Sequence, residues 1–135
     1  MTTILAGTDT SAAADLAVEQ AARLAQEDDA ELVVLYVEGK REAERVVDPT
    51  RAVDPTGHLS RLAARFPGLS ISTRVERGDA AEKLVEVAAE VGASTIVVGN
   101  RGTHGSRWRV RDSVPNLVLR HAPCSVFIVD TRRAQ

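Results

Sequence analysis

The stretch Glu31-Leu32-Val33-Val34-Leu35-Tyr36-Val37 decides the fold class. After Glu31 its residues are apolar without interruption, which is typical of a strand buried on both faces of a parallel sheet. The composition agrees, because 44% of the residues are hydrophobic but only 3% are aromatic. Val, Leu, Ile and Ala must therefore form the core, and β-branched side chains favour strands covered by helices.

Outward from this strand, apolar runs and helical faces alternate along the chain. Apolar residues recur at helical spacing between Ala14 and Ala25 and between Ala81 and Val91. Thr10 or Ser11 is a candidate cap for the first of these helices, Asp79 and Glu82 form a capping pair for the later one, and Gly92 stops it. Further strands are predicted at Thr3–Thr8, Leu69–Glu76, Ser94–Gly99 and Ser125–Val129, and further helices at His58–Arg65 and from the cap Ser113 to Arg120.

This alternation predicts one α/β domain over residues 1–135. Right-handed crossovers give a doubly wound, Rossmann-like parallel sheet of five strands in the order 3-2-1-4-5, with helices on both faces. Leu69–Glu76 alternates apolar with polar residues, so we place it at a half-exposed edge. Ligands of such sheets bind beyond the carboxyl ends of the strands, where the strand order reverses. Gly7–Ser11 and Gly99–Gly102 are expected to meet there.

Composition narrows the classes of function. The net charge of −2 gives no general attraction to nucleic acid or to an anionic membrane. No apolar stretch approaches the roughly 18 residues of a membrane span, and no leader peptide is visible. The single cysteine, Cys124, excludes an internal disulfide, so we expect a cytoplasmic protein. The polar residues 38–57 are expected to form a surface loop, and no histidine or acidic cluster indicates a metal site.

The segment from Gly99 to Ser113 carries the clearest functional signal. It contains four arginines and one aspartate, a local charge of +3 in a chain of net charge −2. Glycines let backbone N–H groups approach a phosphate, and the helix expected after Ser113 presents further N–H groups. Phosphate binding is the function that this segment predicts, and a solvated surface loop is the alternative interpretation.

Several motifs resemble those of universal stress proteins over nearly the whole chain. Gly99-Asn100-Arg101-Gly102, Asp112-Ser113-Val114 and Arg120-His121-Ala122-Pro123-Cys124 are similar to the carboxyl-terminal half of that family. Ala6-Gly7-Thr8-Asp9-Thr10-Ser11 resembles its first strand and turn. The resemblance implies a regulatory module that binds an adenine nucleotide (ATP, AMP or cyclic AMP, with Mg²⁺ as a further component).

The resemblance also implies roles for individual residues. Adenine and ribose would lie near Asp9 and Thr10, with Val37 at the adenine edge. The ribose and phosphates would be held by Gly99, Arg101, Gly102, Ser113 and Val114. Asp9 has an alternative role as a turn residue, and Val37 as an ordinary core residue.

One position departs from the family pattern. Nucleotide-binding members carry Gly-x2-Gly-x9-Gly-Ser/Thr, and here Gly99, Gly102 and Ser113 match while Asp112 replaces the third glycine. A Cβ and a carboxylate thus stand where a phosphate is expected, and two like charges about 4 Å apart repel by about 1 kcal/mol in water. The alternative function is a stress-response scaffold that acts through protein contacts without a nucleotide.

Two further expectations concern activity and assembly. No residue supplies a recognisable general base or nucleophile, so we expect no enzyme, with slow ATP hydrolysis or autophosphorylation left open. The family resemblance implies a homodimer through the last strand. An apolar run on that strand would otherwise form an exposed sheet edge, and it consists of Val126, Phe127, Ile128 and Val129.

Overall fold

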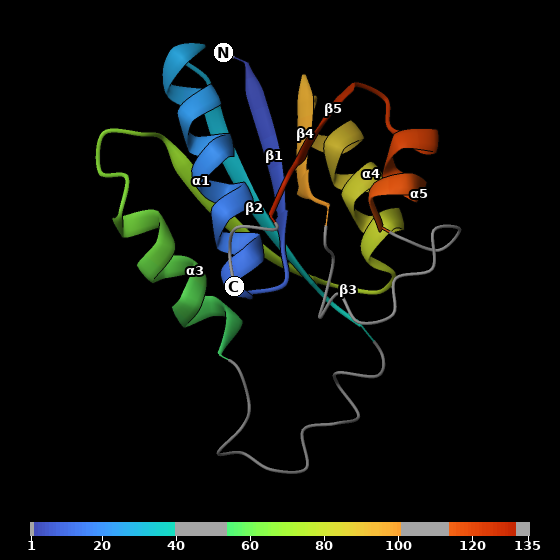
Figure 1. Ribbon diagram of the computed structural model, residues 1–135, viewed down its shortest axis with the longest axis horizontal. Coiled ribbons are helices and arrows are strands. Elements are labelled where there is room, and N and C mark those ends of the chain that lie inside the picture. Colours follow the sequence, from blue (N-terminus) through green and yellow to red (C-terminus); the bar gives the residue numbers. More distant parts are fainter. Residues whose placement is uncertain (1, 40–53, 101–113, 132–135) are drawn as a thin grey trace.

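A five-stranded parallel sheet forms the centre of the protein, which we describe from a computed structural model over residues 2–39, 54–100 and 114–131 (Figure 1). The strand order is β3-β2-β1-β4-β5, which confirms the predicted doubly wound topology. All four neighbouring pairs are parallel. The strands are β1 (Thr3–Thr8), β2 (Glu31–Glu38), β3 (Ile71–Arg77), β4 (Thr95–Gly99) and β5 (Ser125–Val129).

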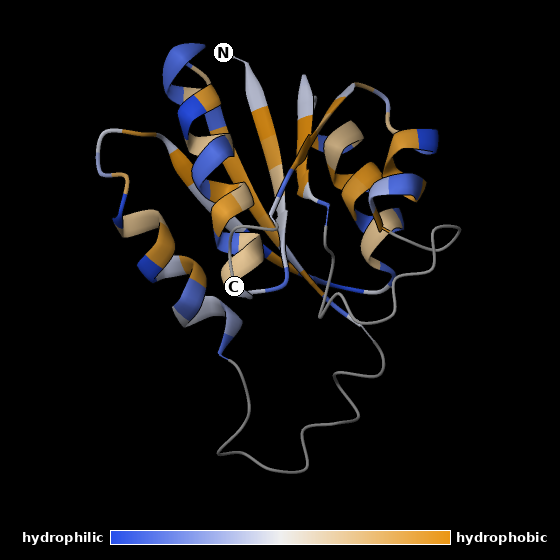
Figure 2. Ribbon diagram, in the orientation of Figure 1, coloured by the Kyte–Doolittle hydropathy of each residue, from blue (hydrophilic) through white to orange (hydrophobic). Residues whose placement is uncertain are grey.

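Helices cover both faces of the sheet. Figure 1 shows α1 (Ala12–Glu27) and α3 (Pro55–Ala64) on one face, and α4 (Ala80–Val91) and α5 (Val114–His121) on the other. Adjacent residues of each strand point to opposite faces, so Ile4 and Ala6 pack toward α1 while Leu5 packs toward α4. The orange colouring of the central strands in Figure 2 reflects this burial on both sides.

Most helix boundaries follow the local signals in the sequence. Ser11 caps α1, because its hydroxyl accepts a hydrogen bond from the Ala14 N–H at 3.1 Å. Asp79 caps α4 by accepting from the Glu82 N–H. Gly92 ends the same helix in the left-handed conformation, with φ at 65°.

The start of α3 corrects the prediction. The helix begins at Pro55, not at His58, and Asp54 caps it by accepting a hydrogen bond from the Gly57 N–H at 3.1 Å. An Asp-Pro pair suits both a turn and a helix start, since Asp is a good cap and Pro is tolerated in the first helical turn. The predicted bounds of the surface loop, 38–57, are therefore wrong at both ends, because Glu38 belongs to β2 and α3 begins at Pro55. Residues 40–53 lie outside the described residues.

The two edges of the sheet differ in chemistry. β3 is an edge strand as predicted, and its Arg74 pairs with Glu76 and with Glu90 of α4. At the other edge, Phe127 and Ile128 of β5 are each 40% exposed. Four apolar residues of β5 were expected to be exposed, and only these two are. Val129 is buried, and Val126 packs against the core below α4 and α5.

Candidate functional site

The candidate site lies where β1 and β4 separate at the carboxyl edge of the sheet. β1 remains paired with β2 as far as Thr8 and Tyr36, whereas its pairing with β4 ends at Ala6 and Val97. The last two residues of β1 and of β4 therefore continue without pairing to each other. The strand order reverses at this point, which is where ligands of doubly wound sheets bind.

The turn from β1 into α1 is held by its own side chains. The Asp9 carboxylate accepts a hydrogen bond from the Ser11 N–H at 2.9 Å, and the Thr8 hydroxyl accepts one from the Thr10 N–H at 3.0 Å. These bonds are typical of Asx and Ser/Thr turns. Asp9 is thus a turn residue, as its alternative role required, and the turn fixes its carboxylate at the site.

Thr10 has an unfavourable backbone conformation in this turn. Its φ is 69°, in the left-handed region that a β-branched residue rarely adopts. Such a conformation costs on the order of 1–2 kcal/mol and persists where the surroundings impose it. The hydrogen bonds of Thr8, Asp9 and Ser11 supply that constraint, so the turn holds a strained residue at the point where the sheet opens.

Gly99 ends β4 beside the same opening. A Cβ on Gly99 would lie 2.9 Å from the methyl carbon (Cγ2) of Thr131 and 3.8 Å from the Cβ of Ala17. The space left by the missing side chain is therefore occupied by the protein itself, on the α1 side of the sheet. A side chain on Gly99 would force Thr131 to shift, so packing favours a glycine here independently of any phosphate.

Val37 and Val114 lie on the opposite side of the sheet from that contact. Both are partly buried against the core beneath α4 and α5, Val37 at the end of β2 and Val114 at the start of α5. The structure thus brings two predicted site residues to one side of the carboxyl edge. The predicted Arg101, Gly102 and Ser113 lie outside the described residues, as does Asp112, the expected departure from the family pattern.

Comparison with known proteins identifies the fold family. A sequence profile described as the universal stress protein family matches residues 1–130. The chain belongs to this family.

Individual relatives agree with this assignment. The universal stress protein YxiE of Bacillus subtilis is 32% identical, over 91% of this chain and 93% of its own length. A solved universal stress protein in complex with cAMP has 28% identity and a TM-score of 0.76, with 96% of this chain and 97% of that chain covered. The protein MJ0577 shares the fold, with a TM-score of 0.80 at 20% identity over 96% and 95% of the two chains.

Three residues of this universal stress protein were given no individual role by the sequence, although Gly7 and Asn100 lie in the two segments expected to meet at the site. Asn100 and Thr131 join the ends of β4 and β5 through hydrogen bonds from the Thr131 N–H and hydroxyl to the Asn100 side chain, both 3.0 Å long. Gly7 admits Leu84 of α4, whose Cδ2 lies 3.0 Å from where a Cβ would be. A glycine inside a strand is the signal that could have identified Gly7. Thr131 lies beyond the last apolar run and carried no such signal.

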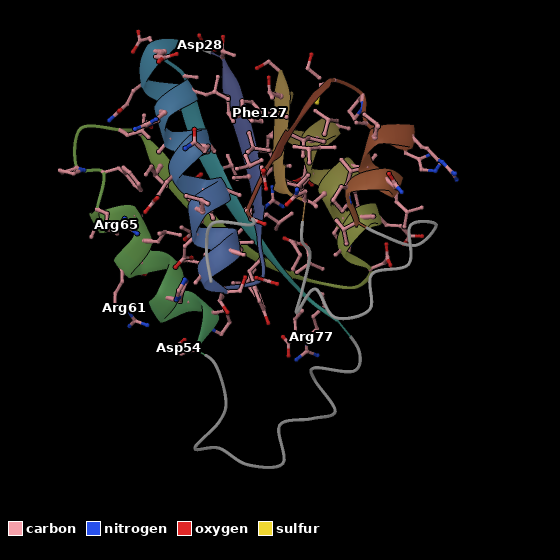
Figure 3. All side chains as sticks on the ribbon, viewed as in Figure 1. Asp28, Asp54, Arg61, Arg65, Arg77 and Phe127 are labelled. Atoms are coloured by element: carbon pink, nitrogen blue, oxygen red, sulfur yellow. The ribbon has the colours of Figure 1, made fainter. Side chains whose placement is uncertain are left out.

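A charged side chain and a thiol lie at opposite ends of the sheet, Arg77 at the carboxyl edge and Cys124 just before the start of β5. Arg77 lies at the carboxyl end of β3 with a 78% exposed side chain, 3.5 Å from Glu38 (Figure 3). Burial raises the pKa of the Cys124 thiol, partly offset by a hydrogen bond with the Ile96 backbone. No group of three or more potential metal ligands, and no helix that could span a membrane, occurs in the part of the chain that the structure describes.

Proposed function

We propose that this universal stress protein binds an adenine nucleotide at the carboxyl edge of its sheet and acts as a regulatory homodimer. The separation of β1 from β4 at the reversal of strand order is the observation that carries the proposal. The solved relative in complex with cAMP, which covers nearly the whole chain, supports adenine nucleotides as the ligand class.

The described residues suggest from which side the nucleotide approaches. Thr131 fills the α1 side of Gly99, while Val37 and Val114 lie on the α4 and α5 side. We therefore assign the adenine to the side of Val37, with the Asp9 carboxylate held nearby by its bond to the Ser11 N–H. Gly99 would support the site through its packing, and the phosphates would contact Arg101, Gly102, Ser113 and the start of α5 at Val114.

Asp112 supports the second candidate function, a scaffold that acts through protein contacts alone. Its carboxylate replaces a glycine in the family's phosphate motif and would repel a phosphate, unless Mg²⁺ or the neighbouring arginines offset the charge. In the scaffold function the sheet edge at Phe127 and Ile128 would be the working surface, and the carboxyl edge would hold no ligand.

Titration calorimetry separates the two functions. The purified protein is titrated with AMP, cyclic AMP and ATP with Mg²⁺, and the protein as isolated is extracted to detect co-purified nucleotide. Saturable binding of one of them, weakened in Asp9→Ala, supports the nucleotide function. Absence of binding by all three, together with no thermal shift, supports the scaffold. Asp112→Gly should tighten ATP binding, with Asp112→Asn as the control that removes the charge but keeps a side chain.

The proposal assigns no catalytic residue. Hydrolysis of ATP above the uncatalysed rate, abolished by Arg101→Ala or Ser113→Ala, would contradict this assignment.

We also propose a cytoplasmic location, because the chain holds one cysteine, Cys124, and its thiol is free.

A further inference from the structure

The chain beyond β5 returns across the end of β4 and is bound there by Asn100. The Asn100 N–H donates a hydrogen bond to the Val129 carbonyl at 2.9 Å. The Asn100 side-chain oxygen accepts from both the N–H and the hydroxyl of Thr131. A longer contact of 3.5 Å joins the Asn100 amide nitrogen to the Asp130 carboxylate. We name Gly99, Asn100 and Thr131 the β4–β5 clamp.

Thr131 is the buried residue of the clamp, and its hydrogen bonds hold the ends of β4 and β5 together. Thr131 is 1% exposed and is the one fully buried polar side chain among the described residues. Its hydroxyl and N–H share the Asn100 oxygen as acceptor, so loss of that oxygen leaves buried donors without this partner, which costs free energy. Its methyl group rests where a Gly99 side chain would be, with Ala17 of α1 behind it. The ends of β4 and β5 therefore move as one unit unless these bonds break.

The clamp lies between the two surfaces that the proposed function uses. Asn100 is joined directly to Arg101 and Gly102, which are assigned to the ribose and phosphates. On its other side it is bound to Val129 and Thr131, immediately after the exposed Phe127 and Ile128 of β5. Self-association that holds β5 also holds Asn100 through these bonds, and a nucleotide bound beside Asn100 would act on the same unit.

We infer that Asn100 is a positioning residue that couples nucleotide binding to self-association through β5. The inference rests on the proposed function and adds its regulation. Because the coupling is between two binding equilibria, it must be reciprocal: nucleotide strengthens the dimer by the same factor by which dimerisation strengthens nucleotide binding. Asn100→Ala keeps the backbone bond to Val129 but removes the acceptor for Thr131, so this factor should fall toward one.

Sedimentation equilibrium measures the dimer dissociation constant with and without the nucleotide that binds best among AMP, cyclic AMP and MgATP. The wild-type protein should show a change of at least about fivefold, and Asn100→Ala less than about twofold. Ser94→Ala is the matched control, since the Ser94 hydroxyl donates to the Thr3 carbonyl at the opposite end of β4. This variant should retain the wild-type factor. Thr131→Val, which loses one of the two bonds and keeps a methyl, should give an intermediate factor.

The outcomes separate failure of the inference from failure of the proposed function. An unchanged coupling factor in Asn100→Ala, or nucleotide binding to a wild-type protein that stays monomeric, overturns the inference while nucleotide binding stands. If the wild-type protein binds none of the three nucleotides, the proposed function fails. The coupling inference then fails with it, because no nucleotide binding remains for Asn100 to couple to self-association.

Discussion

Gly99 is the residue at which packing and function are most closely joined. Its missing side chain accommodates the methyl carbon of Thr131, which lies 2.9 Å from the position of a Cβ. Gly99→Ala should therefore lower the free energy of unfolding by about 1–3 kcal/mol, the usual cost of overpacking a buried site. Urea denaturation followed by circular dichroism measures this change.

The second substitution that tests this contact is Thr131→Ser, which removes the obstructing methyl and keeps the hydroxyl bonded to Asn100. In the double variant Gly99→Ala/Thr131→Ser, the cost of the alanine should be smaller than in the wild-type background. Additive effects of the two substitutions would show that the methyl of Thr131 is not what excludes a side chain at Gly99.

The reactivity of Cys124 should show the effect of burial on the pKa of its thiol. Desolvation raises the pKa of its thiol above the ordinary value of 9.0, and the hydrogen bond with the Ile96 backbone offsets part of this shift. Because the thiolate is the reactive form, the native protein at pH 8 should react with an aromatic disulfide reagent more slowly than the unfolded protein does. Equal rates for native and unfolded protein at that pH would contradict the prediction.

The same shift has a consequence for stability at high pH. A raised folded-state pKa stabilises the native protein below the unfolded value, and this stabilisation is lost as pH rises through the folded value, above 9.0. Cys124→Ala removes the titrating group, so its unfolding free energy should fall less steeply above pH 9 than that of the wild-type protein. This variant is the control for the thiol-reactivity measurement as well.

At the scale of elements, α3 is a short helix with a side-chain cap, Asp54. It has ten residues, and a helix this short is marginal without capping and tertiary contacts. Asp54→Ala removes the acceptor for the Gly57 N–H and should destabilise the protein by about 1 kcal/mol in thermal or urea unfolding. Asp54→Asn retains an oxygen acceptor and should cost much less. Equal losses in the two variants would show that the charge of Asp54, not its capping bond, stabilises the helix.

The bounds of a helix or strand could be predicted where neighbouring residues in the sequence specify them. β1 and β5 have the predicted bounds, because polar residues flank each apolar run: Thr8 is the last residue of β1, and Asp130 follows β5. α3 was placed three residues late, since the Asp54-Pro55 pair favours a turn as well as a helix start. The Gly99–Thr131 contact joins residues 32 positions apart, and no local pattern in a single sequence specifies such a pair.

At the scale of the whole molecule, the two sheet edges differ in how well they suit the proposed homodimer. Charged side chains protect a sheet edge from pairing, and β3 carries Arg74 with its two glutamate partners. β3 also exposes Val75, but β5 exposes two large apolar residues, Phe127 and Ile128. This asymmetry favours self-association through β5 over β3, in agreement with the proposed homodimer.

A matched pair of substitutions tests this asymmetry. Ile128 on β5 and Val75 on β3 are 40% and 41% exposed, so the two edges offer a matched pair of apolar side chains. Ile128→Lys places a charge at the proposed interface, and a buried, unpaired charge is costly. The substitution should therefore weaken the dimer at least about a hundredfold, or roughly 2.7 kcal/mol. Val75→Lys should leave the dimer constant within about twofold, because β3 is assigned to no interface.

Sedimentation velocity over a range of concentrations gives the dimer constants, and circular dichroism verifies that both variants are folded. If Val75→Lys weakens the dimer as much as Ile128→Lys does, the proposed interface is wrong, since the two edges would then contribute alike. If only Ile128→Lys has an effect, β5 forms the interface. The β4–β5 clamp then joins that interface directly to Asn100, so the Ile128→Lys monomer should also bind nucleotide more weakly than the wild-type dimer.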